Sequence, residues 1–135
     1  MNDSGIVYPT VDEMIEFNIM VLNVIKTKKA DKSEILSYSK IKDIVEGCKK
    51  AQGDIYDKAA YLMKQIVGQH AFASGNRRTA FIVTKFFLSA NHEPFTISDN
   101  PDYARIMVGI REKYYTDAEI KNWIKNGTIR EFKRH

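Results

Sequence analysis

The sequence contains one cysteine, Cys48, among its 135 residues. A single thiol excludes a disulfide within the chain and a zinc site built from several cysteines. A reduced, cytoplasmic setting fits this cysteine usage. The sequence also has no apolar run near the roughly 18 residues that a membrane span needs, and no basic segment before an apolar stretch at its N-terminus. We therefore expect neither a membrane helix nor a signal peptide.

Internal repeats, low-complexity stretches and basic stripes interleaved with aromatic residues are also missing. Nucleic-acid binding is therefore not indicated. The composition, 44% hydrophobic and 28% charged with a net charge of +4, is ordinary for a globular chain. The mild positive excess would favour a nucleotide or an acidic partner, but a solvated lysine-rich surface explains it equally well.

The periodicity of apolar residues predicts an all-α fold in a single domain, residues 1–135, with loose ends at 1–9 and 128–135. Capping boxes at Thr10–Glu13 and Thr116–Glu119, and a cap at Asp54, mark helix starts. The expected helices cover about 11–28, 40–51, 54–70, 77–90, 101–113 and 117–126. Residues 95–97 suggest a short extended piece instead.

Three of these helices carry expectations about burial. Met14, Phe17, Val21 and Val24 form the expected inward stripe of the first helix. In the helix over 54–70, His70 falls on the apolar face three residues after Val67, so we expect it to point inward. The helix over 77–90 is apolar nearly all round, which predicts a buried central helix.

The stretch between those last two helices, residues 70–78, reads His-Ala-Phe-Ala-Ser-Gly-Asn-Arg-Arg. Gly75 allows a sharp backbone turn, and Asn76 is a favourable N-cap for the next helix. The free amides of that helix's first turn favour bound anions, and Arg78 adds a guanidinium suited to phosphate oxygens. His70 stands at the other end of the same loop, and an imidazole can serve as a base. A base near a phosphate cradle indicates group transfer from a nucleotide.

The same residues resemble the active-site motif of the Fic/Doc (Fido) family, with His, Phe, Gly, Asn and Arg at fixed spacing. The closer likeness is to the short Doc, or death-on-curing, toxin branch, where a basic residue often occupies the position of Arg77. The resemblance extends from about Tyr8 to Trp123. It implies a compact Fido-type helical bundle around a buried central helix, with a short flap or hairpin in some members.

The resemblance implies a role for each motif residue. His70 would be the general base that takes a proton from a target hydroxyl. Residues 74–78, namely Ser74, Gly75, Asn76, Arg77 and Arg78, would bind the phosphates of ATP or another nucleoside triphosphate. Phe72 would anchor the loop in the core, where burial of its ring is worth roughly 1.5–3 kcal/mol.

One position departs from the family pattern. Ser74 stands where the family usually has an acidic residue that holds magnesium, and a hydroxyl is a much poorer magnesium ligand than a carboxylate. No metal ligand is therefore assigned, and magnesium would have to be held mostly by nucleotide and water. The alternatives are an enzyme of low activity or one that uses a different donor.

The resemblance also implies protein partners. A flap before the motif would dock the target polypeptide by strand addition, and Ile35, Leu36, Ser37 and Tyr38 occupy that place; an ordinary linker between helices is the other interpretation. Family members are often inhibited by a helix with a Ser/Thr-x-x-x-Glu-Gly/Asn pattern. Lys42 breaks that pattern before Glu46-Gly47, so any inhibitory helix would come from a separate antitoxin chain. A homo-oligomer remains an open alternative.

Three functions follow as hypotheses. The first is a Doc-like toxin-type transferase that moves a phosphate to a protein hydroxyl. The resemblance implies it, because Doc-like members with a basic residue at the position of Arg77 transfer a phosphate. The second is Fic-type transfer of AMP, which in the family goes with a glycine at that position. The third, because of Ser74, is a non-catalytic module that binds a nucleotide or a protein.

Overall fold

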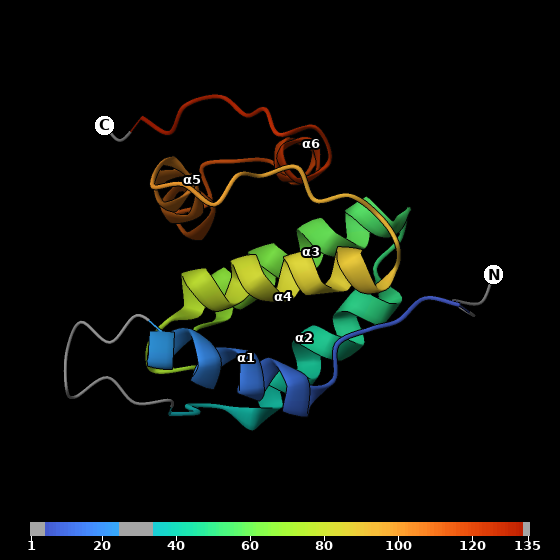
Figure 1. Cartoon of the computed structure of the whole chain (residues 1–135), viewed down its shortest axis with the longest axis vertical. Helices are drawn as coiled ribbons and strands as arrows, with labels where there is room; N and C mark the ends of the chain where they lie inside the picture. Colours follow the sequence, from blue (N-terminus) through green and yellow to red (C-terminus); the bar gives the residue numbers. More distant parts are fainter. Residues whose placement is uncertain (1–4, 25–33, 134–135) are drawn as a thin grey trace.

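The computed structural model describes residues 5–24 and 34–133, and helices dominate these ranges (Figure 1). They are α1 (Val11–Val24), α2 (Tyr38–Lys50), α3 (Ile55–Gln69), α4 (Asn76–Ala90), α5 (Asp102–Arg111) and α6 (Asp117–Asn126). Within the described ranges no strand forms, and the β-type pairing found there is one isolated bridge between Ile35 and Phe72. The predicted all-α class is confirmed.

Local capping explains where three helices begin. At the start of α1, the Thr10 amide donates to Glu13 Oε1 over 2.9 Å and the Glu13 amide donates to Thr10 Oγ1 over 3.0 Å. Thr116 and Glu119 form the same reciprocal pair at the start of α6. The Asp54 side chain accepts two amides of the first turn of α3. All three predicted caps are confirmed, because each depends only on residues two or three positions away.

The helices α3 and α4 lie side by side in the middle of the molecule (Figure 1). α1 and α2 cover one side of this pair, and α5 and α6 cover the other. The predicted central helix, α4, is therefore one of two central helices. The other is α3, which packs against α2, α4, α5 and α6. The loop that joins α3 to α4 therefore lies at one end of the central pair.

Most predicted apolar stripes face the core. Every residue of the predicted stripes of α2, α3 and α6 is buried, except Ile55 at the start of α3, which is half-buried. The buried members are Ile41, Ile44, Val45 and Cys48 in α2, Ala59, Leu62, Met63, Ile66 and Val67 in α3, and Ile120, Trp123 and Ile124 in α6. Cys48 is buried, and its thiol donates to the Lys58 carbonyl over 3.7 Å. These helices follow the sequence pattern because one face of each packs on a neighbouring helix.

The predicted stripe of α1 is wrong at Val24, which is 79% exposed. Phe17 is half-buried and packs against the core, with its ring 5.1 Å from the Phe86 ring. α1 instead buries residues at i, i+4, i+7 and i+8, namely Met14, Asn18, Val21 and Leu22. The helix is rotated so that Asn18 faces the loop between α3 and α4. The predicted extension over residues 25–28 lies outside the described residues.

The prediction of loose ends is wrong for the described parts of both ends. The backbone of Val7 exchanges two hydrogen bonds with the Asn91 side chain, each 2.8 Å long. Near the C-terminus, Phe132 is buried in the main core and its carbonyl accepts from Arg105 Nε over 3.1 Å. Both segments pack against the helices because they carry apolar side chains that complete the core.

Two further expectations concern single segments. Residues 95–97 form no strand; the Phe95 ring packs against the core in a T-shaped pair with Phe81, with ring centroids 5.2 Å apart. Across the described ranges, no helix is both long enough and apolar enough to cross a membrane.

Candidate active site

The loop between α3 and α4 turns sharply at both of its ends. His70, the residue after α3, has a φ of 56°, and Gly75, the N-cap of α4, has a φ of 77°. Glycine adopts this left-handed conformation without steric cost, whereas histidine does so only occasionally. The two turns reverse the chain direction, so α4 runs back alongside α3.

Two neighbouring residues anchor the middle of this loop in the core. Ala71 and Phe72 are 2% and 1% exposed, and both belong to the main hydrophobic cluster. The Asn76 side chain then closes the loop, because its Nδ2 donates to the Phe72 carbonyl over 2.8 Å and its Oδ1 accepts the Phe72 amide over 3.3 Å. The loop is thus held by apolar burial and by a reciprocal pair of hydrogen bonds.

The prediction that Asn76 is the N-cap of α4 is wrong. Gly75 takes that position and supplies no capping side chain, while Asn76 is the first residue of the helix and turns its amide toward Phe72. An N-cap without a side-chain oxygen leaves the first-turn amides to be satisfied by water or by a ligand. This end of α4 therefore keeps the positive potential that favours an anion.

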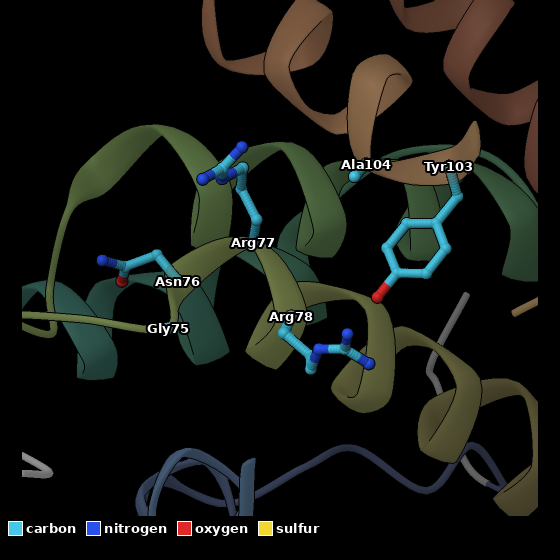
Figure 2. Close-up of a pocket in the computed structure, with 6 residues that line it drawn as sticks. All are labelled: Gly75, Asn76, Arg77, Arg78, Tyr103 and Ala104. Atoms are coloured by element: carbon cyan, nitrogen blue, oxygen red, sulfur yellow. The ribbon is translucent and has the colours of Figure 1, made fainter. Parts of the chain in front are cut away.

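A cavity of about 250 Å³ opens at this helix end (Figure 2). Four of its lining residues come from the motif and two from α5: Gly75, Asn76, Arg77, Arg78, Tyr103 and Ala104. Arg77 and Arg78, whose side chains leave α4 in different directions (Figure 2), and the helix N-terminus give the cavity positive character. Its lining can hold phosphate oxygens through both backbone amides and arginine side chains.

Arg78 is oriented by two groups outside the motif. Its guanidinium lies 6.0 Å from the centre of the Tyr103 ring, and its Nη1 lies 4.0 Å from Asp99 Oδ1. The Tyr103 ring is itself fixed by stacking on Phe81 at 4.2 Å, and burial raises the pKa of its hydroxyl. Figure 2 shows this hydroxyl directed toward Arg78. Arg78 remains partly exposed, so it can exchange the long Asp99 contact for an anion.

His70 does not take the predicted inward position. α3 ends at Gln69, and the left-handed conformation of His70 turns its side chain out of the apolar face, so that the residue is exposed. His70 also does not line the 250 Å³ cavity. The structure thus gathers residues 75–78 around one cavity and leaves His70 at the opposite end of the same loop, accessible to a large substrate.

Ser74 contributes its backbone to the structure of the loop. Its carbonyl accepts from Asn18 Nδ2 over 2.9 Å, which ties the loop to α1. Among the described residues, no group of three or more His, Cys, Asp or Glu side chains is arranged to hold a metal ion. The residues at the motif therefore do not fit a protein-held magnesium ion, and we derive no chemical step through one.

The segment before α2 lies directly against the motif loop. The Leu36 amide donates to the Ala71 carbonyl over 2.8 Å, and the Ala73 amide donates to the Glu34 carbonyl over 2.9 Å. These bonds form the antiparallel bridge between Ile35 and Phe72. In such a pair the N–H and C=O of Ile35 point away from the loop.

Only the first part of the predicted flap is extended. Ser37 is the N-cap of α2, and its Oγ accepts the Lys40 amide over 3.1 Å. Tyr38 therefore starts a helix, and its inclusion in an extended flap is wrong. Leu36 and Tyr38 are 52% and 63% exposed, so two apolar side chains stand at the surface beside the loop.

The sequence prediction did not include Asn18 or Tyr103. Asn18 had a readable signal, since it lies four residues after Met14 and four before Leu22, on the buried face of α1. A polar residue in an apolar stripe indicates a specific hydrogen-bonding role. Tyr103 had no such signal, because its contact with Arg78 depends on how α5 packs against α4.

Comparison with protein families gives one match, to the family model described as "Fic/DOC family", over residues 10–88. This range includes α1, α2, α3, the motif loop and nearly all of α4. No curated protein matches the chain.

Proposed function

Because this chain belongs to the Fic/DOC family, we propose that it is a transferase that moves a phosphate from a nucleoside triphosphate to a hydroxyl of a target protein. Members of the family are usually enzymes that transfer a group to proteins. The observation that carries the proposal is the cavity at the N-terminus of α4, lined by Arg77 and Arg78. Both the amides and the guanidinium groups suit the phosphates of a donor nucleotide.

The proposed reaction assigns a role to each part of the loop. His70 takes the proton of the target hydroxyl as the hydroxyl oxygen forms a bond to the terminal phosphorus. The bond between that phosphorus and the nucleoside diphosphate breaks, and the diphosphate leaves. Arg78 and the amides around Arg77 hold the phosphate oxygens and stabilise the charge of the transition state.

The target protein would approach over the segment before α2. The outward-facing N–H and C=O of Ile35 can pair with an added strand, and Leu36 offers an exposed apolar contact beside it. Because His70 is exposed, a hydroxyl on such a strand can reach it. A toxin role in the cytoplasm, inhibition by an antitoxin helix and self-association belong to the same proposal.

Transfer of AMP is the nearest alternative within the same reaction class. It would place the alpha phosphorus, rather than the terminal one, at the hydroxyl. Arg77 would decide between phosphate transfer and AMP transfer. Its long cationic side chain narrows the space along the N-terminus of α4 and would add positive charge beside the terminal phosphate. We favour phosphate transfer for this reason.

A non-catalytic binding module is the second candidate function. Two observations favour it: Ser74 stands in the place of the metal-binding acid, and His70 does not line the cavity. Such a module would bind a nucleotide or a protein without transfer.

Incubation with ATP labelled at the gamma or alpha position, in the presence of cell extract, separates the candidates. We expect gamma label on protein, lost in His70→Ala. His92→Ala is a matched control, since His92 is also exposed and also has a positive φ, of 60°. Alpha label that depends on His70 would support AMP transfer instead. Equal labelling by wild type and His70→Ala, or no label by either from ATP or from any other labelled nucleoside triphosphate, would rule out the transferase.

A further inference from the structure

We propose that Asn18 of α1 is a positioning residue that holds the anion-binding turn of the motif in place. The proposal rests on the proposed function of that turn. Asn18 is completely buried on an otherwise apolar helix face. Burial of an amide is costly unless it is hydrogen-bonded, so an apolar residue would serve packing alone better.

The side-chain amide of Asn18 donates hydrogen bonds to residues on both sides of the turn. Its Nδ2 donates to the Ser74 carbonyl over 2.9 Å, just before Gly75, and to Thr79 Oγ1 over 3.1 Å, just after the first turn of α4. Thr79 is itself fully buried. One side-chain nitrogen thus spans the segment whose amides would meet a phosphate.

α1 also makes direct contact with the glycine of the turn. A Cβ atom at Gly75 would lie 3.1 Å from Leu22 Cδ2 and 3.3 Å from Asn18 Nδ2. The backbone of Gly75 therefore lies close to α1, at a separation that a Cβ atom would tighten. This contact and the two hydrogen bonds together fix the position of the turn against α1.

The hydrogen bond to Ser74 sets the direction of an amide in the turn. No cis peptide bond occurs in the described residues, and in a trans peptide the C=O and N–H point in opposite directions. Since the Ser74 carbonyl points toward Asn18, the N–H of Gly75 points away from α1. Gly75 also lines the cavity, so in this proposal Asn18 orients the Gly75 donor before an anion arrives.

The test compares Asn18→Leu with Asn91→Leu, which removes an asparagine at the opposite end of α4. Asn91 is a suitable match because its Nδ2 also donates to two acceptors, the carbonyls of Val7 and Phe87. Amide hydrogen exchange is measured in the free proteins, and binding of pyrophosphate is measured by NMR titration.

In Asn18→Leu we expect exchange of the Thr79 amide, which donates to the Gly75 carbonyl over 2.8 Å and closes the turn, to accelerate at least about tenfold relative to the amides of α6. Pyrophosphate binding should weaken by a similar factor. Asn91→Leu should lose thermal stability without either local effect. Equal exchange of the turn in the two variants would overturn the proposal and leave Asn18 a packing residue.

A second variant and a ligand-free measurement keep the test of Asn18 decisive if folding or pyrophosphate binding fails. If Asn18→Leu does not fold, Thr79→Val removes only the bond to the Thr79 hydroxyl and should give a smaller acceleration at the backbone amide of position 79; no acceleration there would also overturn the proposal. If the wild type binds no pyrophosphate and transfers no label, the proposed function fails. The exchange comparison still decides whether Asn18 holds the turn, because it needs no ligand.

Discussion

Phe72 and Asn76 exchange two hydrogen bonds across the tip of the motif loop. Asn76 Nδ2 donates to the Phe72 carbonyl over 2.8 Å, and the Phe72 amide donates to Asn76 Oδ1 over 3.3 Å. The Phe72 ring lies in the core at 1% exposure. Asn76 therefore links the start of α4 to the best-anchored residue of the loop, and its side-chain amide is already engaged there.

Substitution of Asn76 should destabilise the whole chain. Asn76→Ala removes both bonds and leaves the Phe72 amide and carbonyl without these partners, which should cost about 1–3 kcal/mol in the free energy of unfolding. Urea denaturation measures the change. Asn126→Ala is the control, because Asn126 donates to Asn122 on the exposed surface of α6 and should change stability by less than about 0.5 kcal/mol. Equal losses in the two variants would contradict the prediction.

A side chain at Gly75 should destabilise the fold. Gly75→Ala would place a Cβ 3.1 Å from Leu22 Cδ2 at a φ of 77°, so we expect a loss of about 1–2 kcal/mol and a lower melting temperature. Gly68→Ala is the matched control. Gly68 lies within α3, and a Cβ there meets nothing within 4 Å, so alanine should stabilise by about 0.5–1 kcal/mol. Thermal unfolding of the two variants should therefore shift in opposite directions.

Replacement of Arg77 should change which phosphate is transferred. Arg77→Gly removes the cation and opens space along the N-terminus of α4, where Arg77 lines the cavity. We expect the ratio of gamma to alpha label on the target protein to fall at least about tenfold, while Arg78 continues to bind the donor. Lys85→Gly, at another exposed position of α4, controls for the cost of glycine in a helix. An unchanged label ratio in Arg77→Gly would show that Arg77 does not select the donor phosphate.

The C-terminal segment should make stability depend on pH in the acid range. A hydrogen bond from Arg130 lowers the pKa of the Glu119 carboxyl from 4.5 to about 2, and the Thr116 amide contributes further. Since the pKa is lower in the folded state, the contribution is present above about pH 4.5 and is lost as the pH falls toward 2. Thermal unfolding from pH 2 to 7 should show a steeper acid limb for wild type than for Arg130→Ala.

Lys133→Ala provides the control for this pH experiment, because it removes an exposed positive charge from the same segment. Its acid limb should match that of the wild type. If Arg130→Ala and wild type lose stability in parallel between pH 4.5 and 2, the ion pair with Glu119 does not supply the expected stabilisation.

The sequence by itself determined the helices and the motif. Thr10, Asp54 and Thr116 start helices through hydrogen bonds that reach only two or three residues along the chain, so their neighbours suffice to predict them. The stripes of α2, α3 and α6 follow from helical periodicity in the same way. The residues at positions 70–78 also indicate an anion-binding turn without reference to the packing of the helices.

The tertiary structure alone decided the surroundings of that turn. Asn18 and Ser74 are 56 positions apart, and their hydrogen bond exists only because α1 packs across the end of α4. Asn76 turned to Phe72 instead of capping its helix, and His70 turned outward because the loop closes between two left-handed residues. Contacts between distant segments depend on how whole helices pack against one another, and the local sequence pattern does not specify that packing.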